Sequence, residues 1–471
     1  MNEGKLTTHE KALKINLDPR RYGTFAEIGA GQEVARWFFR VGGGAGTIAK
    51  SMSAYDMLVS DAIYGPSDRY VSRHRLQSML DHEHKLNLER LQERRSHNTT
   101  FFAFADTVAA RSFKGGNECH GWMGVKFQAH PRDEDSQVII HVRMLDNENA
   151  LQQEALGIVG VNLLYAAFFL HHEPEQMIES LLDNLTTNRI EVDMIEFSGI
   201  EFRRVDNRLM SLKLVQIGLS DAALFSANGS VLQPSEVLHK KPILVERGSF
   251  RPVCHVNLDM LEAARQKFQE DLGPDSPPIV QLMEITMNNL MATGQIDYQD
   301  FLARADVMAA CGMTVLVSNY FQYYRLAAYL SRYSKMKIAI TMGIPSLRDL
   351  FEEKYYTDLE GGILESLGRL FKNDLKLYIY PLKDMATGNL TKVDNLEIPP
   401  DLRPLYTYLR NKNYIHQLEN YREEYLGVFS RDILRKIGKG DPTWEEGVPP
   451  AVAEVIKKNG FFGYHRSAVL V

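Results

Sequence analysis

The segment PILVERGSFR, residues 242–251, combines the two features that decide the fold class. Its apolar run, residues 243–245, is short and rich in branched side chains, which is typical of a strand buried on both faces of a parallel sheet. The polar side chains that follow the run are Glu246, Arg247, Ser249 and Arg251. Because ligands of parallel sheets bind beyond the carboxyl ends of the strands, we expect this segment to supply both a core strand and part of a binding site.

Similar short apolar runs recur along the chain, and segments with helical spacing separate most of them. They are VIIHVRM (138–144), IEVDMIEF (190–197), AALFSANG (222–229), LMEITM (282–287), TVLVSN (314–319), KIAITM (337–342) and LKLYIYP (375–381). Strands that alternate with helices favour a mainly parallel sheet with helices on its faces. We therefore predict an α/β protein built from two such units. A (β/α)8-like barrel is the alternative, because eight strands could close on themselves.

Composition shifts divide the chain into three parts. Residues 1–98 show helical spacing of apolar side chains, which predicts a helical N-terminal segment. The first α/β domain is expected at residues 99–270, and the second at residues 279–471 with a helical, tyrosine-bearing tail. The segment EDLGPDSPP, residues 270–278, separates the domains because it contains three prolines and no apolar periodicity.

Particular elements can be expected inside these parts. Residues 47–63 are predicted to be helical. The charged, leucine-bearing helix at 69–95 is typical of one that packs on a partner subunit, so we expect a homo-oligomer. The helix at 149–170 is apolar on nearly all sides, which predicts a core helix. Three strand-like runs at 101–108, 121–128 and 137–145 are separated by turn signals and favour two antiparallel pairings.

The composition limits the class of protein. The formal net charge of −6 argues against nucleic acid as a partner, and the hydrophobic content of 44% is ordinary for a globular protein. Three widely spaced cysteines predict no disulfide framework, and the first residues lack the apolar core of a signal peptide, so we expect a cytoplasmic protein. The longest apolar run, residues 156–170, is shorter than the roughly 20 residues that a transmembrane helix needs.

Polar residues at the strand ends are the best candidate site. The residues that we select are Arg247, Ser249, Arg251, Asn288 and Asn319. If their strands are neighbours, Arg247 and Arg251 would form an anion clamp, because guanidinium groups suit phosphate and carboxylate. The alternative is ordinary loop polarity with salt bridges. Tyrosine-rich segments at 319–325 and 353–362 could stack a base, although a subunit interface is the favoured interpretation.

A second candidate is the turn EIGAGQ, residues 27–32. Gly29 and Gly31 could let a phosphate-bearing cofactor approach backbone N–H groups at a helix N-terminus. The third glycine of the dinucleotide pattern is replaced by Val34. A helix start with a flexible turn is therefore the alternative.

The pair Cys119-His120 follows a glycine turn and could belong to a nucleophilic site. Adjacent strand residues point to opposite faces, so the two side chains cannot activate each other. A second histidine would be needed, and His141 or His255 could serve. No histidine or cysteine has a metal-site spacing such as HExxH or CxxC, so we expect no metal centre.

Three stretches, residues 23–56, 240–253 and 353–365, resemble an uncharacterised family of bacterial proteins over nearly the whole chain. Members of this family often carry the label nicotinate-nucleotide adenylyltransferase, so the resemblance implies a nucleotidyltransferase of NAD metabolism. Such enzymes have an HxGH phosphate motif. In this sequence the pair His120-Gly121 is not part of an HxGH motif, so the resemblance assigns no catalytic residue here.

These observations lead to one expectation and two alternatives. We expect a cytosolic, oligomeric α/β protein that binds an anionic, phosphate-bearing small molecule such as a nucleotide. A non-catalytic, self-assembling scaffold is the first alternative, because no catalytic motif is complete. The nucleotidyltransferase implied by the resemblance is the second. The sequence does not decide whether the protein is an enzyme.

Overall fold

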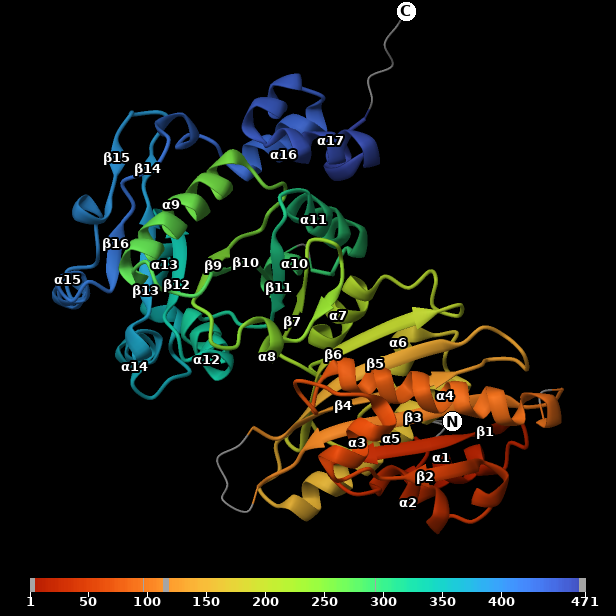
Figure 1. The fold of residues 1–471 in the computed structure, drawn as a ribbon. Coiled ribbons are helices and arrows are strands. Elements are labelled where there is room, and N and C mark those ends of the chain that lie inside the picture. The colour runs from red at the N-terminus through yellow and green to blue at the C-terminus, as the bar shows by residue number, and fades with distance from the viewer. Residues whose placement is uncertain (1–4, 96, 113–117, 293, 466–471) are drawn as a thin grey trace, which may run out of the picture. The chain divides into compact units, whose positions relative to one another are not determined.

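A computed structural model of the protein describes residues 5–95, 97–112, 118–292 and 294–465. The chain divides into two compact units, Met1–Asp221 (unit 1) and Ala222–Val471 (unit 2), and each contains one main sheet (Figure 1). The division does not coincide with the expected boundary at 270–278. That segment joins a helix to a strand inside unit 2, because the strands on its two sides pair directly in one sheet.

Unit 1 contains a six-stranded mixed sheet of order β2-β1-β3-β4-β5-β6. Its strands are β1 (Arg21–Ile28), β2 (Ile48–Met52), β3 (Thr100–Ala109), β4 (His120–Phe127), β5 (Ser136–Met144) and β6 (Ile190–Gly199). β1 pairs in parallel with β2 and β3, and the strands from β3 to β6 pair antiparallel. The two antiparallel pairings expected among the central strands are therefore confirmed.

The expected helical segment at residues 1–98 is only partly helical, because β1 and β2 lie within it. Their strand character was hidden by polar residues such as Arg21 and Glu27, which are buried in β1 and have partners inside the unit. β2 also occupies the start of the helix that we expected at 47–63. Only the later part of that segment is helical, as α3 (Met57–Tyr64).

Helices cover both faces of this sheet. One face carries α1 (Thr8–Asn16), α2 (Glu33–Arg40), α5 (Asn149–Phe169), α6 (Pro174–Ser180) and α7 (Asn207–Gln216). The other face carries α4 (Arg73–Arg95), which lies across the strands in Figure 1. Leu76 and Leu80 of α4 are fully buried against the unit's own sheet. The expected partner-facing role of this helix stays a prediction, whereas the core helix at 149–170 is confirmed as α5.

Unit 2 contains an eight-stranded sheet of order β16-β13-β12-β9-β10-β11-β7-β8. Its strands are β7 (Ala222–Phe225), β8 (Val231–Leu232), β9 (Ile243–Arg247), β10 (Val280–Thr286), β11 (Thr314–Ser318), β12 (Ile338–Gly343), β13 (Lys376–Tyr380) and β16 (Ile415–Gln417). The six strands from β16 to β11 in this order are parallel. β7 and β8 add an antiparallel edge, and β14 (Leu382–Lys383) pairs with β15 (Leu390–Thr391) as a separate hairpin.

The parallel sheet of unit 2 is also covered on both faces. Its helices are α8 (Pro234–Val237), α9 (His255–Leu272), α10 (Met287–Leu290), α11 (Tyr298–Ala310), α12 (Tyr323–Tyr333), α13 (Ile344–Leu350), α14 (Gly362–Leu370), α15 (Arg403–Asn411), α16 (Ser430–Lys439) and α17 (Pro450–Asn459). Val245 and Ile340 face a core shared with α12 and α14. The opposite face packs on α9, where Tyr378 donates a hydrogen bond to Asp271 at 2.7 Å.

These two open sheets confirm the predicted α/β class. The strands do not close into the (β/α)8-like barrel that was the alternative, because each sheet ends at free edge strands. The order in unit 2 also explains where its chain changes direction. From β9 the chain adds β10 and β11 on one side, then returns to place β12 and β13 on the other side of β9.

No helix within the described part of the chain combines the length and the apolar character that crossing a membrane requires.

Candidate functional site

A cavity of about 520 Å³ lies in unit 2, where the parallel strands end. Its walls come from the loop after β9, the β10–α10 junction, the β11–α12 loop, α13 and α16. The chain direction reverses between β9 and β12, and the strand order read from β11 to β16 is that of doubly wound, dinucleotide-binding sheets. In such sheets the ligand crevice lies outside the carboxyl ends at this reversal, which is where the cavity is found.

The structure brings four of the predicted site residues to this cavity. They are Arg247, Ser249, Arg251 and Asn288. Asn319 is not among the lining residues and is exposed beyond the end of β11. Gly29 and Gly31 lie in unit 1, at the end of β1.

Arg247 has a different role from the expected anion clamp. Its Nε and Nη2 donate to the two carboxylate oxygens of Glu284 at 2.8 and 3.0 Å, and its Nη1 donates to the carbonyl of Phe321 at 2.7 Å. The guanidinium also lies 4.3 Å from the ring centroid of Tyr323. Burial is the largest single effect and would lower the pKa of Arg247, but the charge and hydrogen bonds of Glu284, together with Tyr323, outweigh it and raise the pKa. Its charge is therefore already neutralised inside the protein.

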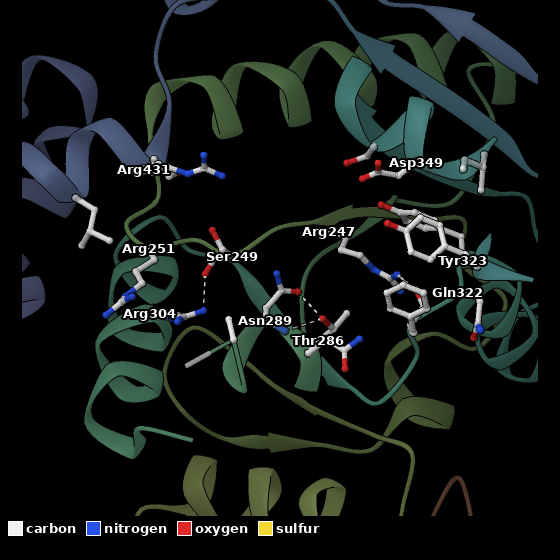
Figure 2. A pocket seen from close by; sticks show the side chains of 18 of the residues that line it. Arg247, Ser249, Arg251, Thr286, Asn289, Arg304, Gln322, Tyr323, Asp349 and Arg431 are labelled. Atoms are coloured by element: carbon white, nitrogen blue, oxygen red, sulfur yellow. Dashed lines mark hydrogen bonds between the residues drawn. The ribbon is translucent and has the colours of Figure 1, made fainter. Parts of the chain in front are cut away.

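Arg251 and Arg304 share one carboxylate. The Nε of Arg251 donates to Asp300 at 2.6 Å, and the Nε of Arg304 donates to the other oxygen of Asp300 at 2.6 Å. Arg304 also donates to the carbonyl of Ser249 at 3.2 Å (Figure 2). Two guanidinium groups against one carboxylate leave one positive charge beside the loop that follows β9.

Arg431 adds a further cation. It is exposed on α16 and makes no ion pair with the residues that the structure describes. Its side chain points toward the cavity, and that of Asp349 approaches from the other side (Figure 2). Ser430 fixes this end of α16, because its hydroxyl donates to the carbonyl of Pro252 at 3.1 Å. Four lining arginines against Asp349 and the carboxylates of Glu284 and Asp300 leave the site with one net positive charge.

Aromatic side chains form the opposite wall. They are Phe321, Tyr323, Tyr355 and Tyr356. The rings of Phe321 and Tyr355 lie edge to face, with centroids 5.3 Å apart. These residues come from the two tyrosine-rich segments for which a subunit interface was the favoured interpretation. In the structure they line the cavity within one unit, and such rings can stack a planar group.

Sequence reasoning missed Arg304, Asp349 and Arg431, although they face the same cavity as Arg251. These three residues lie on helices far along the chain from β9, in segments that carry no local motif. Their charge alone did not distinguish them from exposed helix residues. Only the packing of α11, α13 and α16 places them at the strand ends.

The glycine turn of unit 1 has a structural explanation. The carboxylate of Glu27 accepts hydrogen bonds from the backbone N–H groups of Val34 and Ala35 at 2.9 and 2.8 Å. The protein's own carboxylate therefore occupies the N-terminus of α2, where the cofactor was expected. Gly29 has φ +104°, and a Cβ there would lie 2.0 Å from the carbonyl oxygen of Val108.

Replacement of Gly29 by alanine should lower the free energy of unfolding by about 2–4 kcal/mol, since it combines a steric clash with an unfavourable backbone angle. Gly31→Ala is the matched control. Gly31 has φ +88°, but a Cβ there would meet only Oε1 of Glu33 at an ordinary contact distance of 3.9 Å, so only about 1 kcal/mol is expected. Urea denaturation of both variants measures the difference. Equal losses of unfolding free energy in the two variants would show that close packing on β3 is not the reason for glycine at position 29.

The side chains of His120 and Cys119 point to opposite faces of the sheet of unit 1. Cys119 packs against the hydrophobic core, whereas His120 lies beside His141. No group of three histidine, cysteine or acidic side chains suited to hold a metal ion occurs among the described residues.

The chain matches no model of a known protein family, and none of the curated proteins compared with it matches. Among solved structures it is similar to the competence/damage-inducible protein CihA from Agrobacterium tumefaciens, with 17% identity, 35% of this chain and 98% of that chain covered, and a TM-score of 0.26. A competence-damaged protein (CinA) superfamily protein from Enterobacter cloacae gives 12% identity, coverage of 36% and 95%, and a TM-score of 0.27. Similarity at this level supports no conclusion about the fold or function of this chain.

Proposed function

We propose that unit 2 binds a phosphate-bearing small molecule, such as a nucleotide, in the cavity at the carboxyl ends of its parallel strands. The observation that carries the proposal is the excess of guanidinium groups at the reversal of strand order. Arg251 and Arg304 share one carboxylate, and Arg431 has none. Guanidinium groups recognise phosphate through paired, charge-assisted hydrogen bonds.

The aromatic wall supports a ligand with a planar end. Phosphate groups would contact Arg251 and Arg431, and a base would lie against Phe321 and Tyr355. The cavity volume of about 520 Å³ falls within the range of small-molecule sites. The cavity residues support binding and do not define a reaction. The nucleotidyltransferase implied by the family resemblance is therefore an alternative with less support.

Thermal unfolding of the purified protein with ATP, ADP, NAD and inorganic pyrophosphate tests this proposal. A ligand present at 100 times its Kd stabilises the folded state by about 2.7 kcal/mol, which raises the melting temperature by several degrees. We expect at least one nucleotide to do so, and adenosine to have a smaller effect because it lacks phosphate. No shift with any phosphate-bearing compound would contradict the proposal.

A second candidate function, self-assembly, has separate support in unit 1. Tyr55, Met57 and Leu58 lie together at the start of α3 and are 75%, 60% and 80% exposed. Neighbouring large apolar side chains with this exposure are typical of protein interfaces. This patch, rather than the buried leucines of α4, supports the proposed homo-oligomer.

Leu58→Glu should reduce self-association, because it places a charge in the centre of this patch. Light scattering at micromolar concentration is expected to give a larger mass for the wild-type protein than for the variant. Leu364→Glu, at another exposed apolar position in unit 2, serves as the control. A monomeric wild-type protein would rule out assembly through α3 at this concentration.

A further inference from the structure

Three side chains on neighbouring strands of the unit 1 sheet are linked by hydrogen bonds, outside the cavity of unit 2. The Nδ1 of His120 on β4 lies 2.9 Å from the Nε2 of His141 on β5. The Nδ1 of His141 lies 2.5 Å from a carboxylate oxygen of Asp193 on β6. The antiparallel pairing of these strands fixes the order Asp193–His141–His120 from the interior outward.

The hydrogen bonds determine where the protons lie. The carboxylate of Asp193 can only accept, so the Nδ1 of His141 carries a proton, and in the neutral form of this ring the Nε2 accepts. The Nδ1 of His120 must then donate to it. A neutral His120 therefore has an unprotonated Nε2, whose lone pair points away from His141.

Burial of the inner members keeps this arrangement fixed. His141 and Asp193 are 1% and 2% exposed, and the indole of Trp122 lies edge-on to His141 with ring centroids 4.9 Å apart. His120 is only partly buried. Its Nε2 has no hydrogen-bond partner among the described residues and is not a buried atom. The hydrogen-bonded series of side chains thus ends at an accessible nitrogen, the Nε2 of His120.

The charges around His120 come from several elements. The pKa of His120 is lowered to about 4, first by burial and then by the neighbouring His141, and Asp193 partly opposes these effects. Arg69, which precedes α4, and Arg143 on β5 also lower it. Arg143 is paired with Glu191 at 2.5 Å and lies 3.5 Å from Glu118. The ring is neutral near pH 7, so its Nε2 can accept a proton.

We propose that His120 is the general base of a second site, in unit 1, and that it takes a proton from a water molecule or a hydroxyl-bearing substrate. The O–H bond breaks and an N–H bond forms at Nε2. The resulting imidazolium donates more strongly to His141, and the carboxylate of Asp193 offsets its charge through that ring. His141 and Asp193 are positioning residues, because they act through His120.

Labelling with diethyl pyrocarbonate at pH 5 tests the proposal, since this reagent carbethoxylates only unprotonated imidazole nitrogens. Peptide mass spectrometry follows each histidine separately. At pH 5 an ordinary histidine is about 3% neutral, whereas a group with a pKa of about 4 is about 90% neutral. The ratio of these neutral fractions is about 30, so we expect His120 to react well over tenfold faster than the reference His172, which is 65% exposed.

Two variants of His141 separate positioning from simple exposure. His141→Phe removes the acceptor that fixes the proton on Nδ1 of His120, so labelling of His120 should fall about tenfold. His141→Gln retains an acceptor and should restore most of the rate. The rate at His172 should be unchanged in both, which provides an internal control.

Equal labelling of His120 and His172 in the wild-type protein would overturn the proposal. So would an unchanged rate at His120 in a folded His141→Phe variant. If that variant does not fold, nitrogen-15 NMR of the histidine-labelled wild-type protein decides. The proposal requires the signal of an unprotonated Nε2 for His120, and a protonated Nε2 near pH 7 would contradict it.

Discussion

Replacement of Arg247 by methionine is expected to lower the free energy of unfolding by about 3–5 kcal/mol. The substitution leaves Glu284, which is fully buried, without the guanidinium that accounts for two of its hydrogen bonds. Among the described residues, the hydroxyl of Ser318, at 2.6 Å, would remain as the single side-chain donor to this carboxylate. An unpaired charge inside a protein costs far more than the pair itself contributes. Urea denaturation monitored by circular dichroism measures the loss.

Two further variants test this explanation. Arg247→Met combined with Glu284→Gln removes both charges and should recover most of the lost stability, because an amide can still accept from Ser318. Arg265→Ala breaks the exposed pair of Arg265 and Glu262 and should cost less than about 1 kcal/mol. If Arg247→Met costs no more than Arg265→Ala, Arg247 is not a buried structural cation.

Glu246 should make the stability of unit 2 depend on pH. Burial raises the pKa of this carboxyl from 4.5 to about 8, and the hydrogen bond from Asn257 opposes the rise only partly. Its second oxygen has no partner among the described residues. Because folded Glu246 retains a proton that it loses in the unfolded chain, its contribution to stability is complete below pH 4.5 and is lost as the pH rises toward 8. The decline is on the order of 1.4 kcal/mol for each pH unit.

Glu246→Gln should remove this contribution, because glutamine is neutral at every pH and can still accept from Asn257. Urea denaturation at pH 5, 6.5 and 8 should give a smaller decline for the variant than for the wild-type protein. The two proteins must be compared by their slopes of stability against pH. Burial also raises the pKa of Glu27 to about 7, and this carboxyl adds the same pH dependence to the wild-type protein and to the variant. Identical slopes would show that Glu246 is ionised in the folded state.

Local patterns predicted the second half of the chain better than the first. Runs such as residues 243–245 are short, rich in branched apolar side chains and followed by polar residues. Buried parallel strands require these features, so the local sequence was enough to predict them. The same reasoning placed Arg251 and Asn288 at one cavity. The order of the strands could not be predicted, since it depends on pairings between distant segments.

The N-terminal strands were missed because their buried polar residues broke the apolar pattern. Arg21 donates to Thr100, which lies 79 residues away, and Glu27 caps α2 only seven and eight residues further on, an interaction that no apolar pattern indicates. The expected anion clamp failed at Arg247 for the same reason. Its neutralising partner, Glu284, lies on the next strand and was not recognised as a buried carboxylate. Long-range pairing decided the outcomes at Arg21 and Arg247.

Isothermal titration of ADP into the wild-type protein, Arg431→Ala and Arg435→Ala tests the central claim most directly. Arg431 lines the cavity, whereas Arg435 lies on the same helix, is 65% exposed and pairs with Asp432. A charge-assisted hydrogen bond contributes about 1.5–3 kcal/mol, so Arg431→Ala should raise the Kd by about 10- to 100-fold. Arg435→Ala should leave the Kd nearly unchanged. Absence of binding, or equal Kd values for the two variants, would contradict an anionic ligand at the strand ends of unit 2.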